Sequence, residues 1–388
     1  MKLAIVHGRV LTMAEKGKQV VEQGTVLVND GKIEKILEKE DHIPAEYRFI
    51  DAKGCFVLPG FVEAHCHMGI TEEKKGMEGD DCNESVNPVT PSLRAIDAIN
   101  PMDDAFHNAV RAGITAAMIG PGSSNVVGGQ FVVLNNEGRC IDDMILRFPA
   151  ALKVAFGENP KVNYNGMGKS PSTRMAIADM LRKELLDAKQ YLKNHKKNED
   201  RKLQYEAYRA VFDKKIPLKA HVHRADDILT AIRIAKEFDL DMTLDHCSEG
   251  HLIVDEIKNA GFPAIVGPDL ASRNKIEVQN MAFKTAGVLS KAGVLTAITT
   301  DHPVSIIQTL PLCAALAVKE GMEMEEALKA ITINAAKICR VDDRIGSLEP
   351  GKQADIVIFD RHPFDIFAKT MCVLIKGKLV HRAPEFFL

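Results

Sequence analysis

Between residue 58 and about residue 345 the chain alternates short apolar runs with longer amphipathic segments, and this alternation restricts its fold more than any other feature. Such a pattern is typical of a parallel sheet covered by helices. If the poorly patterned segment 131–147 supplies one strand, eight strands result, and the prediction is an eight-stranded α/β barrel of the (β/α)8 TIM type. The other runs are 58–68, 115–119, 151–156, 217–223, 241–246, 263–267 and 294–301.

The two ends of the chain have a different pattern. Residues 1–57 contain short strand-like runs with a turn at Asn29-Asp-Gly31, and residues 346–388 repeat this style. Neither end carries enough strands to bury a sheet face by itself. We therefore expect 1–57 and 346–388 to form one composite β-sandwich domain beside a barrel built from 58–345.

Composition and charge narrow the class of protein. Hydrophobic residues make up 46% and charged residues 27% of 388 residues, which is ordinary for a globular protein. A net charge of −3 without a basic block argues against nucleic acid as a partner. No apolar run reaches the roughly 18–20 residues that cross a membrane. The eight cysteines are scattered singly, so we expect reduced thiols in a cytoplasmic protein.

The run Leu58–Met68 ends in His65 and His67, one residue apart. Side chains alternate faces along a strand, so both imidazoles point the same way and can hold one divalent ion, although ordinary hydrogen bonds would also account for an isolated pair. Three later runs also end in His or Asp, and the carboxyl ends of barrel strands share one face. Metal-type ligands should therefore converge there: His65, His67, His221, His223, His246 and Asp301.

These segments resemble the amidohydrolase superfamily in its imidazolonepropionase-like branch. The most specific matches are Pro59–His67 (PGFVEAHCH), Thr300–Pro303 (TDHP) and Gly346–Val357, and the resemblance extends over almost the whole chain. It implies a metal-dependent hydrolase whose barrel is flanked by a β-sandwich made from both chain ends. It also implies one or two divalent metal ions, with zinc the first choice and manganese or iron acceptable to the same ligands.

The resemblance also implies roles for single residues. His65 and His67 match the first metal pair, and Asp301 matches an aspartate that binds metal and takes the proton of the hydrolytic water. His246 matches a histidine that is a ligand in binuclear members and a substrate contact in some mononuclear ones. His221 is favoured as the ligand from its strand, which leaves His223 for the substrate, for catalysis or for support of a ligand.

The bridging position has three readings. Lys153 matches the lysine that binuclear members carboxylate to bridge two metals, and a buried lysine needs such a use because an unpaired buried charge is costly. Glu158 offers a carboxylate instead, as a glutamate does in the deacetylase branch. A mononuclear site needs neither residue.

Weaker candidates for substrate contact lie in loops. Asn125 and Gln130 belong to the Gly-rich loop 120–130, which leaves a strand at the expected functional face, although a plain turn explains it equally well. Glu158 and Arg224 are further candidates, with surface ion pairing the common fate of such an arginine.

The expected reaction is hydrolysis of a C–N bond in a small molecule, such as an amide, a cyclic amide or an amidine-like group. Metal binding lowers the pKa of water toward neutrality, and Asp301 would act as general acid and base. Two other functions remain open: a deaminase of a heterocyclic substrate at the same site, and a catalytically silent barrel scaffold. The outer helices of a barrel could support a homodimer, but no residue pattern specifies one.

Overall fold

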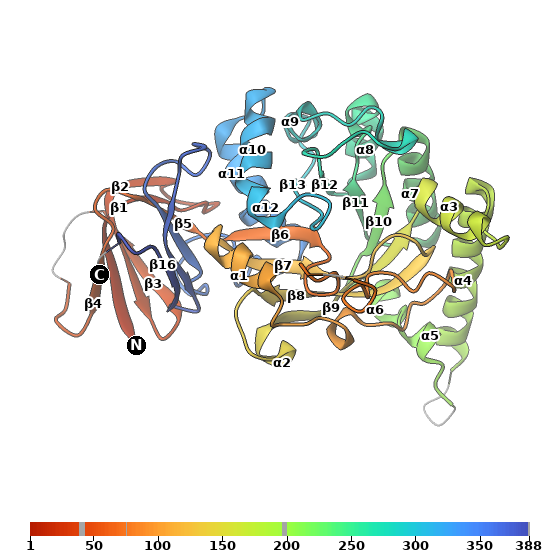
Figure 1. Ribbon diagram of the computed structural model, residues 1–388, viewed down its shortest axis with the longest axis horizontal. Helices are drawn as coiled ribbons and strands as arrows, with labels where there is room; N and C mark the ends of the chain where they lie inside the picture. The colour runs from red at the N-terminus through yellow and green to blue at the C-terminus, as the bar shows by residue number, and fades with distance from the viewer. Residues whose placement is uncertain (39–42, 75, 196–199, 387–388) are drawn as a thin grey trace.

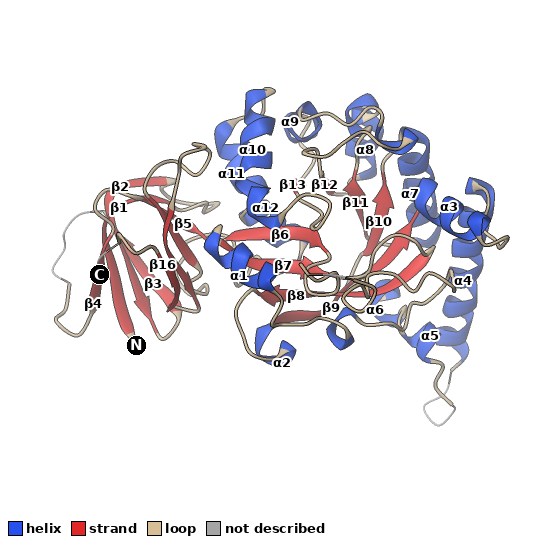
Figure 2. Ribbon diagram, in the orientation of Figure 1, coloured by secondary structure: helices blue, strands red, loops and turns tan. Residues whose placement is uncertain are grey.

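The computed structural model describes residues 1–38, 43–74, 76–195 and 200–386. These residues form two separate sheets of eight strands each, an open terminal sheet and a barrel sheet that is wrapped by helices (Figures 1 and 2). None of the helices in the described ranges is both long and apolar enough to span a lipid bilayer.

The terminal sheet takes strands from both ends of the chain. Its order is β16-β15-β14-β5-β1-β2-β3, with β4 paired to β1. The N-terminal and C-terminal strands meet where β14 pairs with β5 in antiparallel register, Val357 opposite Leu58. The bounds are β1 Lys2–Leu11, β2 Val20–Asn29, β3 Lys32–Leu37, β4 Arg48–Asp51, β5 Phe56–Pro59, β14 Ile356–Phe359, β15 Thr370–Ile375 and β16 Lys378–Arg382.

The barrel sheet contains strands β6 to β13 in sequence order within the described chain. Its ends meet, because the His67 amide donates to His302 O at 2.8 Å and Thr299 Oγ1 lies 2.7 Å from His65 O, so the sheet is a nearly closed barrel. The bounds are β6 Phe61–Cys66, β7 Ile114–Ile119, β8 Val127–Asn135, β9 Ile145–Ala155, β10 Leu218–Val222, β11 Met242–His246, β12 Ala264–Val266 and β13 Thr296–Ile298.

One strand of this barrel runs against the others, so the expectation of eight parallel strands is wrong at that point. Strand β8 is antiparallel to both β7 and β9, whereas the remaining pairs are parallel. The connections 120–126 and 136–144 are shorter than the dozen or so residues that a parallel crossover requires. The segment 131–147 therefore holds the end of β8, a tight reversal and the start of β9.

Helices cover the outside of the barrel (Figure 2). Most residues of β6, β7, β10 and β11 are buried on both faces, which explains their near-continuous apolar character. The helices are α1 Asp104–Arg111, α2 Ile141–Met144, α3 Glu158–Gly166, α4 Arg174–Asn194, α5 Leu203–Glu206, α6 Arg209–Phe212, α7 Ala225–Phe238, α8 Val254–Ala260, α9 Lys284–Lys291, α10 Leu310–Lys319, α11 Met324–Ala330 and α12 Ile333–Ile338. Short 3₁₀ helices lie at Ala95–Asp97, Gly250–Leu252, Ile276–Val278 and Ile307–Thr309.

A buried carboxylate connects the two sheets. Asp355, next to β14, accepts a hydrogen bond from Asn135 Nδ2 of β8 at 3.0 Å and from the Lys376 amide at 2.8 Å. Its main-chain carbonyl accepts from the Gly60 amide at 2.9 Å, at the passage from β5 to β6. The terminal sheet is thus attached to the amino-terminal end of the barrel, opposite the rim where His65 lies.

Candidate metal centre

Strand β6 carries two histidines to the carboxyl rim, and each ring is oriented by its Nδ1 atom. His65 Nδ1 lies 2.8 Å from Asp245 Oδ2, and His67 Nδ1 lies 2.7 Å from the carbonyl oxygen of Gly120. Because these partners accept hydrogen bonds, the proton is assigned to Nδ1 in both rings. Both Nε2 atoms are then left with a free lone pair, which is how metal-binding histidines are held.

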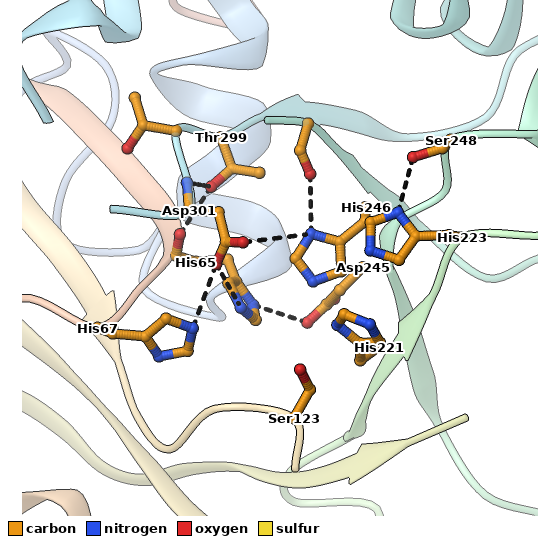
Figure 3. Close-up of polar contacts among 12 residues, drawn as sticks. His65, His67, Ser123, His221, His223, Asp245, His246, Ser248, Thr299 and Asp301 are labelled. Carbon is orange, nitrogen blue, oxygen red and sulfur yellow. Dashed lines mark hydrogen bonds and ion pairs between the residues drawn. The ribbon is translucent and has the colours of Figure 1, made fainter. Parts of the chain in front are cut away.

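Asp301 follows β13 and faces these two lone pairs. Its Oδ1 lies 3.4 Å from His65 Nε2 and 3.2 Å from His67 Nε2, and its Oδ2 lies 3.9 Å from His246 Nδ1 (Figure 3). Oδ1 is buried and has no hydrogen-bond partner among the described residues. A buried acceptor oxygen that faces two ring nitrogens favours positive charge between them, either a proton or a metal ion. The residues therefore fit a divalent cation.

Electrostatics lead to the same conclusion. Burial lowers the pKa of His67, but Cys82 and the Asp301 carboxylate outweigh burial and raise this pKa to about 10, so without a metal ion Nε2 also carries a proton, which a bound cation would replace. Burial raises the pKa of Asp301, yet His246, His65 and His67 together hold it well below its usual range. The centre thus keeps its carboxylate ionised and favours a cation beside it.

Three further histidines lie next to this group. The rings of His221 and His223, from the end of β10, are 4.5 and 4.7 Å from the ring of His246, and His223 and His246 are stacked. Burial is the main cause that lowers the pKa of His223 to about 3 and that of His246 well below its usual range, so both rings are neutral. Two groups have ligand atoms close enough to share an ion: His65, His246 and Asp301, and His221, His223 and His246.

Lys153 reaches the same centre from β9. Its Nζ lies 3.3 Å from His65 Nε2, and its side chain is fully buried. Burial lowers the pKa of Lys153 to about 8. Glu158, the other residue considered for the bridging role, is placed elsewhere: its Oε2 accepts from the Glu277 amide at 3.3 Å.

Lys219 and Asp245 were missed by the sequence reasoning, although they lie inside the barrel directly below the centre. Lys219 Nζ is 3.2 Å from Asp245 Oδ2 and donates to Ala64 O at 3.0 Å. Burial raises the pKa of Asp245, but Lys219 and His65 more than offset this and hold it below its usual range. Their charge was the feature of the sequence that could have identified them, because ionic residues within a buried apolar run need partners.

Glu63 was also missed. Its buried carboxylate accepts from Thr299 Oγ1 at 2.5 Å, from Thr300 N at 2.9 Å and from Thr300 Oγ1 at 2.7 Å. It therefore attaches β6 to the segment that carries Asp301. Its position two residues before His65, on the same strand face, was the available clue.

The weaker candidates make contacts of their own. Asn125 is buried, and its Nδ2 donates to the carbonyl oxygens of Glu84 and Asn87, each at 2.7 Å, so its amide holds the loop 84–87. Gln130 Nε2 lies 3.3 Å from Pro91 O. Arg224 pairs with Asp226 at 2.9 Å on the surface. Their proposed contact with substrate has no support from these hydrogen bonds.

A cavity of about 270 Å³ lies beside Lys153 and the rim. Its wall includes Gly128, where an added Cβ would lie 3.3 Å from Lys153 Cγ. Cys82, Pro121 and Arg94 are also in the wall, as are carboxylates of the acidic loop, including Asp80 and Glu84.

Family comparison defines the class of protein. A profile of the amidohydrolase family matches residues 56–380, so the chain belongs to the amidohydrolase family, whose members are hydrolases acting on C–N bonds. This confirms the resemblance seen in the sequence.

Individual relatives agree with that class. The crystal structure of an amidohydrolase from Thermotoga maritima MSB8 shares 39% identity and a TM-score of 0.93, and the match covers 98% of this chain and 100% of that one. The imidazolonepropionase of Caldanaerobacter subterraneus subsp. tengcongensis is 28% identical over 89% of this chain and 86% of that protein. The amidohydrolase tasK of Hapsidospora irregularis is also 28% identical over 91% of this chain, but this chain spans only 39% of that protein's length.

Proposed function

We propose that this protein hydrolyses a C–N bond of a small molecule, in an amide, a cyclic amide or an amidine-like group, with a divalent metal ion at the rim of the barrel. The observation that carries the proposal is the buried Asp301 Oδ1, which lies 3.2 and 3.4 Å from the Nε2 atoms of His67 and His65 and lacks a hydrogen bond in the described structure. Zinc is the proposed ion because imidazole and carboxylate ligands suit it.

The ligands that we propose are His65, His67, Lys153, His221, His246 and Asp301. An ion held by them would supply Lewis acidity and a water of lowered pKa. Asp301 would accept the proton of the attacking water on its carboxylate and return it to the leaving nitrogen. His223 Nδ1 lies 2.8 Å from Ser248 Oγ, which fixes the ring and leaves Nε2 for a substrate or an ion.

Lys153 is the proposed bridging residue, after reaction with carbon dioxide to a carbamate. That reaction needs a neutral amine, and a pKa of about 8 leaves about a tenth of the amine neutral at pH 7. The fully buried side chain would then be an anion beside the ligands instead of a cation. Mass spectrometry of the native protein tests this directly, since the carbamate adds about 44 Da to Lys153.

Replacement of the general base tests the function. We expect Asp301→Asn to lower kcat/KM by about 10²–10⁴ at saturating zinc on any cyclic amide that the wild type opens, because the variant lacks the proton acceptor. Substrates are screened by release of a new carboxylate or of ammonia from panels of cyclic amides, linear amides and amino-heterocycles. Bound metal is measured in parallel.

Asp239→Asn is the matched control, because Asp239 is exposed, caps α7 and pairs with Lys214 at 2.7 Å. It should keep wild-type rates. An Asp301→Asn protein with more than a third of the wild-type rate would rule out the proposed role. Ammonia release from amino-heterocycles without any ring opening would favour the deaminase instead.

A further inference from the structure

Glu277 is a buried carboxylate at the rim that neither the family ligands nor the expected site includes. It lies in the 3₁₀ helix Ile276–Val278, in the loop between β12 and α9, and only 1% of its surface is exposed. Burial raises its pKa, but His221 and His223 outweigh burial and lower the pKa to about 2. The side chain is therefore a buried anion.

One oxygen of this carboxylate is fixed by the main chain. The amide of Glu158 donates to Glu277 Oε2 at 3.1 Å, and the amide of Glu277 lies 3.3 Å from Glu158 Oε2. This reciprocal pair joins the start of α3 to the loop of Glu277. The rotation of the Glu277 carboxylate is therefore determined, and Oε1 is directed to the other side.

The second oxygen is directed at histidines and lacks a hydrogen bond. Glu277 Oε1 lies 3.8 Å from His221 Nε2 and 3.9 Å from His223 Nε2, and it is buried without a hydrogen-bond partner in the described residues. The ring of His223 is held through Nδ1 by Ser248, so Nε2 is the atom that faces the carboxylate. The two imidazole rings are 4.7 Å apart.

These separations are too long for hydrogen bonds and close to those of ligands around one ion. Metal–ligand bonds of about 2.0–2.1 Å in tetrahedral geometry place ligand atoms about 3.3 Å apart. The two Oε1–Nε2 separations would each have to shorten by about 0.5 Å to reach that spacing. Two histidines and one glutamate, with a fourth position open, are a known ligand set for zinc.

We propose that Glu277, His221 and His223 form a divalent-cation position of their own, next to the one at Asp301, and that zinc is the ion it takes. Here His223 is a ligand rather than a contact for the substrate, and His221 binds this ion instead of the one at Asp301, because a neutral imidazole has only one lone pair for a metal. This inference adds one ion to the proposed function. It rests on the proposed function only for the neighbouring ion at Asp301.

Lys275 offers a different partner for the same oxygen. Its Nζ lies 3.7 Å from Glu277 Oε1, but it donates to Asn159 Oδ1 at 2.7 Å and 41% of its side chain is exposed. If Glu277 only balances this lysine, the carboxylate has no effect on metal binding. If Glu277 is a ligand, removal of the lysine charge should leave the ion in place or bind it more tightly.

The test measures metal stoichiometry rather than rate. Wild-type protein and variants are stripped with a chelator, reloaded with excess zinc, desalted and analysed by elemental mass spectrometry. Cobalt loading gives absorption bands as a second readout. Glu277→Gln should bind about one equivalent fewer than wild type, or bind that equivalent at least about 100-fold more weakly, because it removes an anionic ligand. His223→Gln should lose the same equivalent, so the test survives if one of the two variants does not fold.

Two controls are matched to Glu277. Glu249 is also a buried rim glutamate, but its oxygens accept from Ala225 N at 2.7 Å and Asn280 Nδ2 at 2.8 Å. Glu249→Gln and Lys275→Met should therefore keep the wild-type metal content. Glu277→Gln and His223→Gln proteins that both fold with wild-type melting curves and hold the full metal content would overturn the inference. If in that case the wild type still hydrolyses its substrate and Asp301→Asn does not, only the further inference is refuted and the proposed function stands. A wild type that binds no zinc would refute both.

Discussion

His246, Cys247 and Asp301 have left-handed backbone conformations at the rim, with φ angles of 72°, 50° and 51°. Such conformations are strained for residues with a side chain, by about 1–3 kcal/mol each, and they persist where surrounding contacts enforce them. Here His246 Nδ1 bonds to Gly267 O at 2.8 Å, and the Asp301 amide bonds to Thr299 Oγ1 at 3.0 Å. The strain turns the chain sharply after each strand, so these side chains reach over the end of the barrel.

Asp269 gives a pH dependence that belongs to a single residue. Burial raises its pKa to about 7, and Oδ1 lacks a hydrogen-bond partner in the described structure. Between pH 4 and pH 7 the native state therefore holds more protons at this group than the unfolded state. Stability conferred by protonated Asp269 is present at low pH and is lost as the pH rises through about 7.

We expect Asp269→Asn to remove this loss. The free energy of unfolding, from urea titrations at pH 5 and pH 8, should fall less between the two pH values in the variant than in the wild type. Subtracting the two profiles cancels the other titrating groups. Parallel profiles would show that Asp269 is not buried in its protonated form.

Among the elements, β6 and the segment after β13 depend on each other through Glu63. Four hydrogen bonds to its carboxylate, from His65 N, Thr299 Oγ1, Thr300 N and Thr300 Oγ1, close the barrel next to Asp301. The carboxylate accepts all four, so it matches a ring of donors that no neutral side chain of this size can satisfy.

Glu63→Gln should destabilise the fold because its amide nitrogen would face donors. Each donor left unpaired costs roughly 1–3 kcal/mol. Glu22→Gln is the control, since Glu22 is 64% exposed and pairs with Arg9, a contact worth at most about 1 kcal/mol. Urea denaturation measures both variants, and equal midpoints for the two would refute the role of Glu63.

Some elements could be predicted from the sequence because local patterns determine them. Apolar runs ending in His or Asp identified β6, β10 and β11, since burial on both faces leaves a continuous apolar signature. The direction of β8 could not be read from its residues, because strand patterning is the same in both directions. Only the short lengths of the connections before and after β8 indicated that it is antiparallel to its neighbours.

The residues of the candidate site also fall into those that the sequence could predict and those that it could not. His65, His67 and Asp301 were predictable because each ends a recognisable strand. Glu277 was not predictable, because it lies in a long loop. The Glu158 amide, 119 residues away in the sequence, orients its carboxylate toward His221 by a hydrogen bond. Asp245 and Lys219 were hidden for another reason: their pairing is visible only once two strands are in register.

For the whole molecule, the two sheets are joined at buried polar contacts. Asp355 accepts from Asn135 Nδ2 of the barrel at 3.0 Å, and Gln353 Nε2 donates to Asn135 Oδ1 at 3.1 Å. Burial raises the pKa of Asp355, and the hydrogen bonds from Lys376 N, Gln353 and Asn135 work against that rise. The amino-terminal end of the barrel therefore depends on the chain that leads into β14.

Asn135→Ala should loosen both sheets, because it leaves a buried carboxylate short of a donor, at a cost of about 1–3 kcal/mol. Hydrogen exchange should become faster in 127–135 and in 356–375. Asn108→Ala provides the control, since Asn108 makes an exposed contact with Glu73 at 3.3 Å. Faster exchange confined to the barrel would show that the sheets do not stabilise each other through this contact.

The pairing of β14 with β5 has a consequence during protein synthesis. Strand β5 leaves the ribosome about 300 residues before β14, which at cellular translation rates is a delay of roughly 15–60 s. Over that interval the N-terminal strands present an open hydrogen-bonding edge to solvent, or to a chaperone. Slower translation would lengthen that exposure, so the yield of native protein should depend on how quickly the roughly 300 residues between β5 and β14 are made.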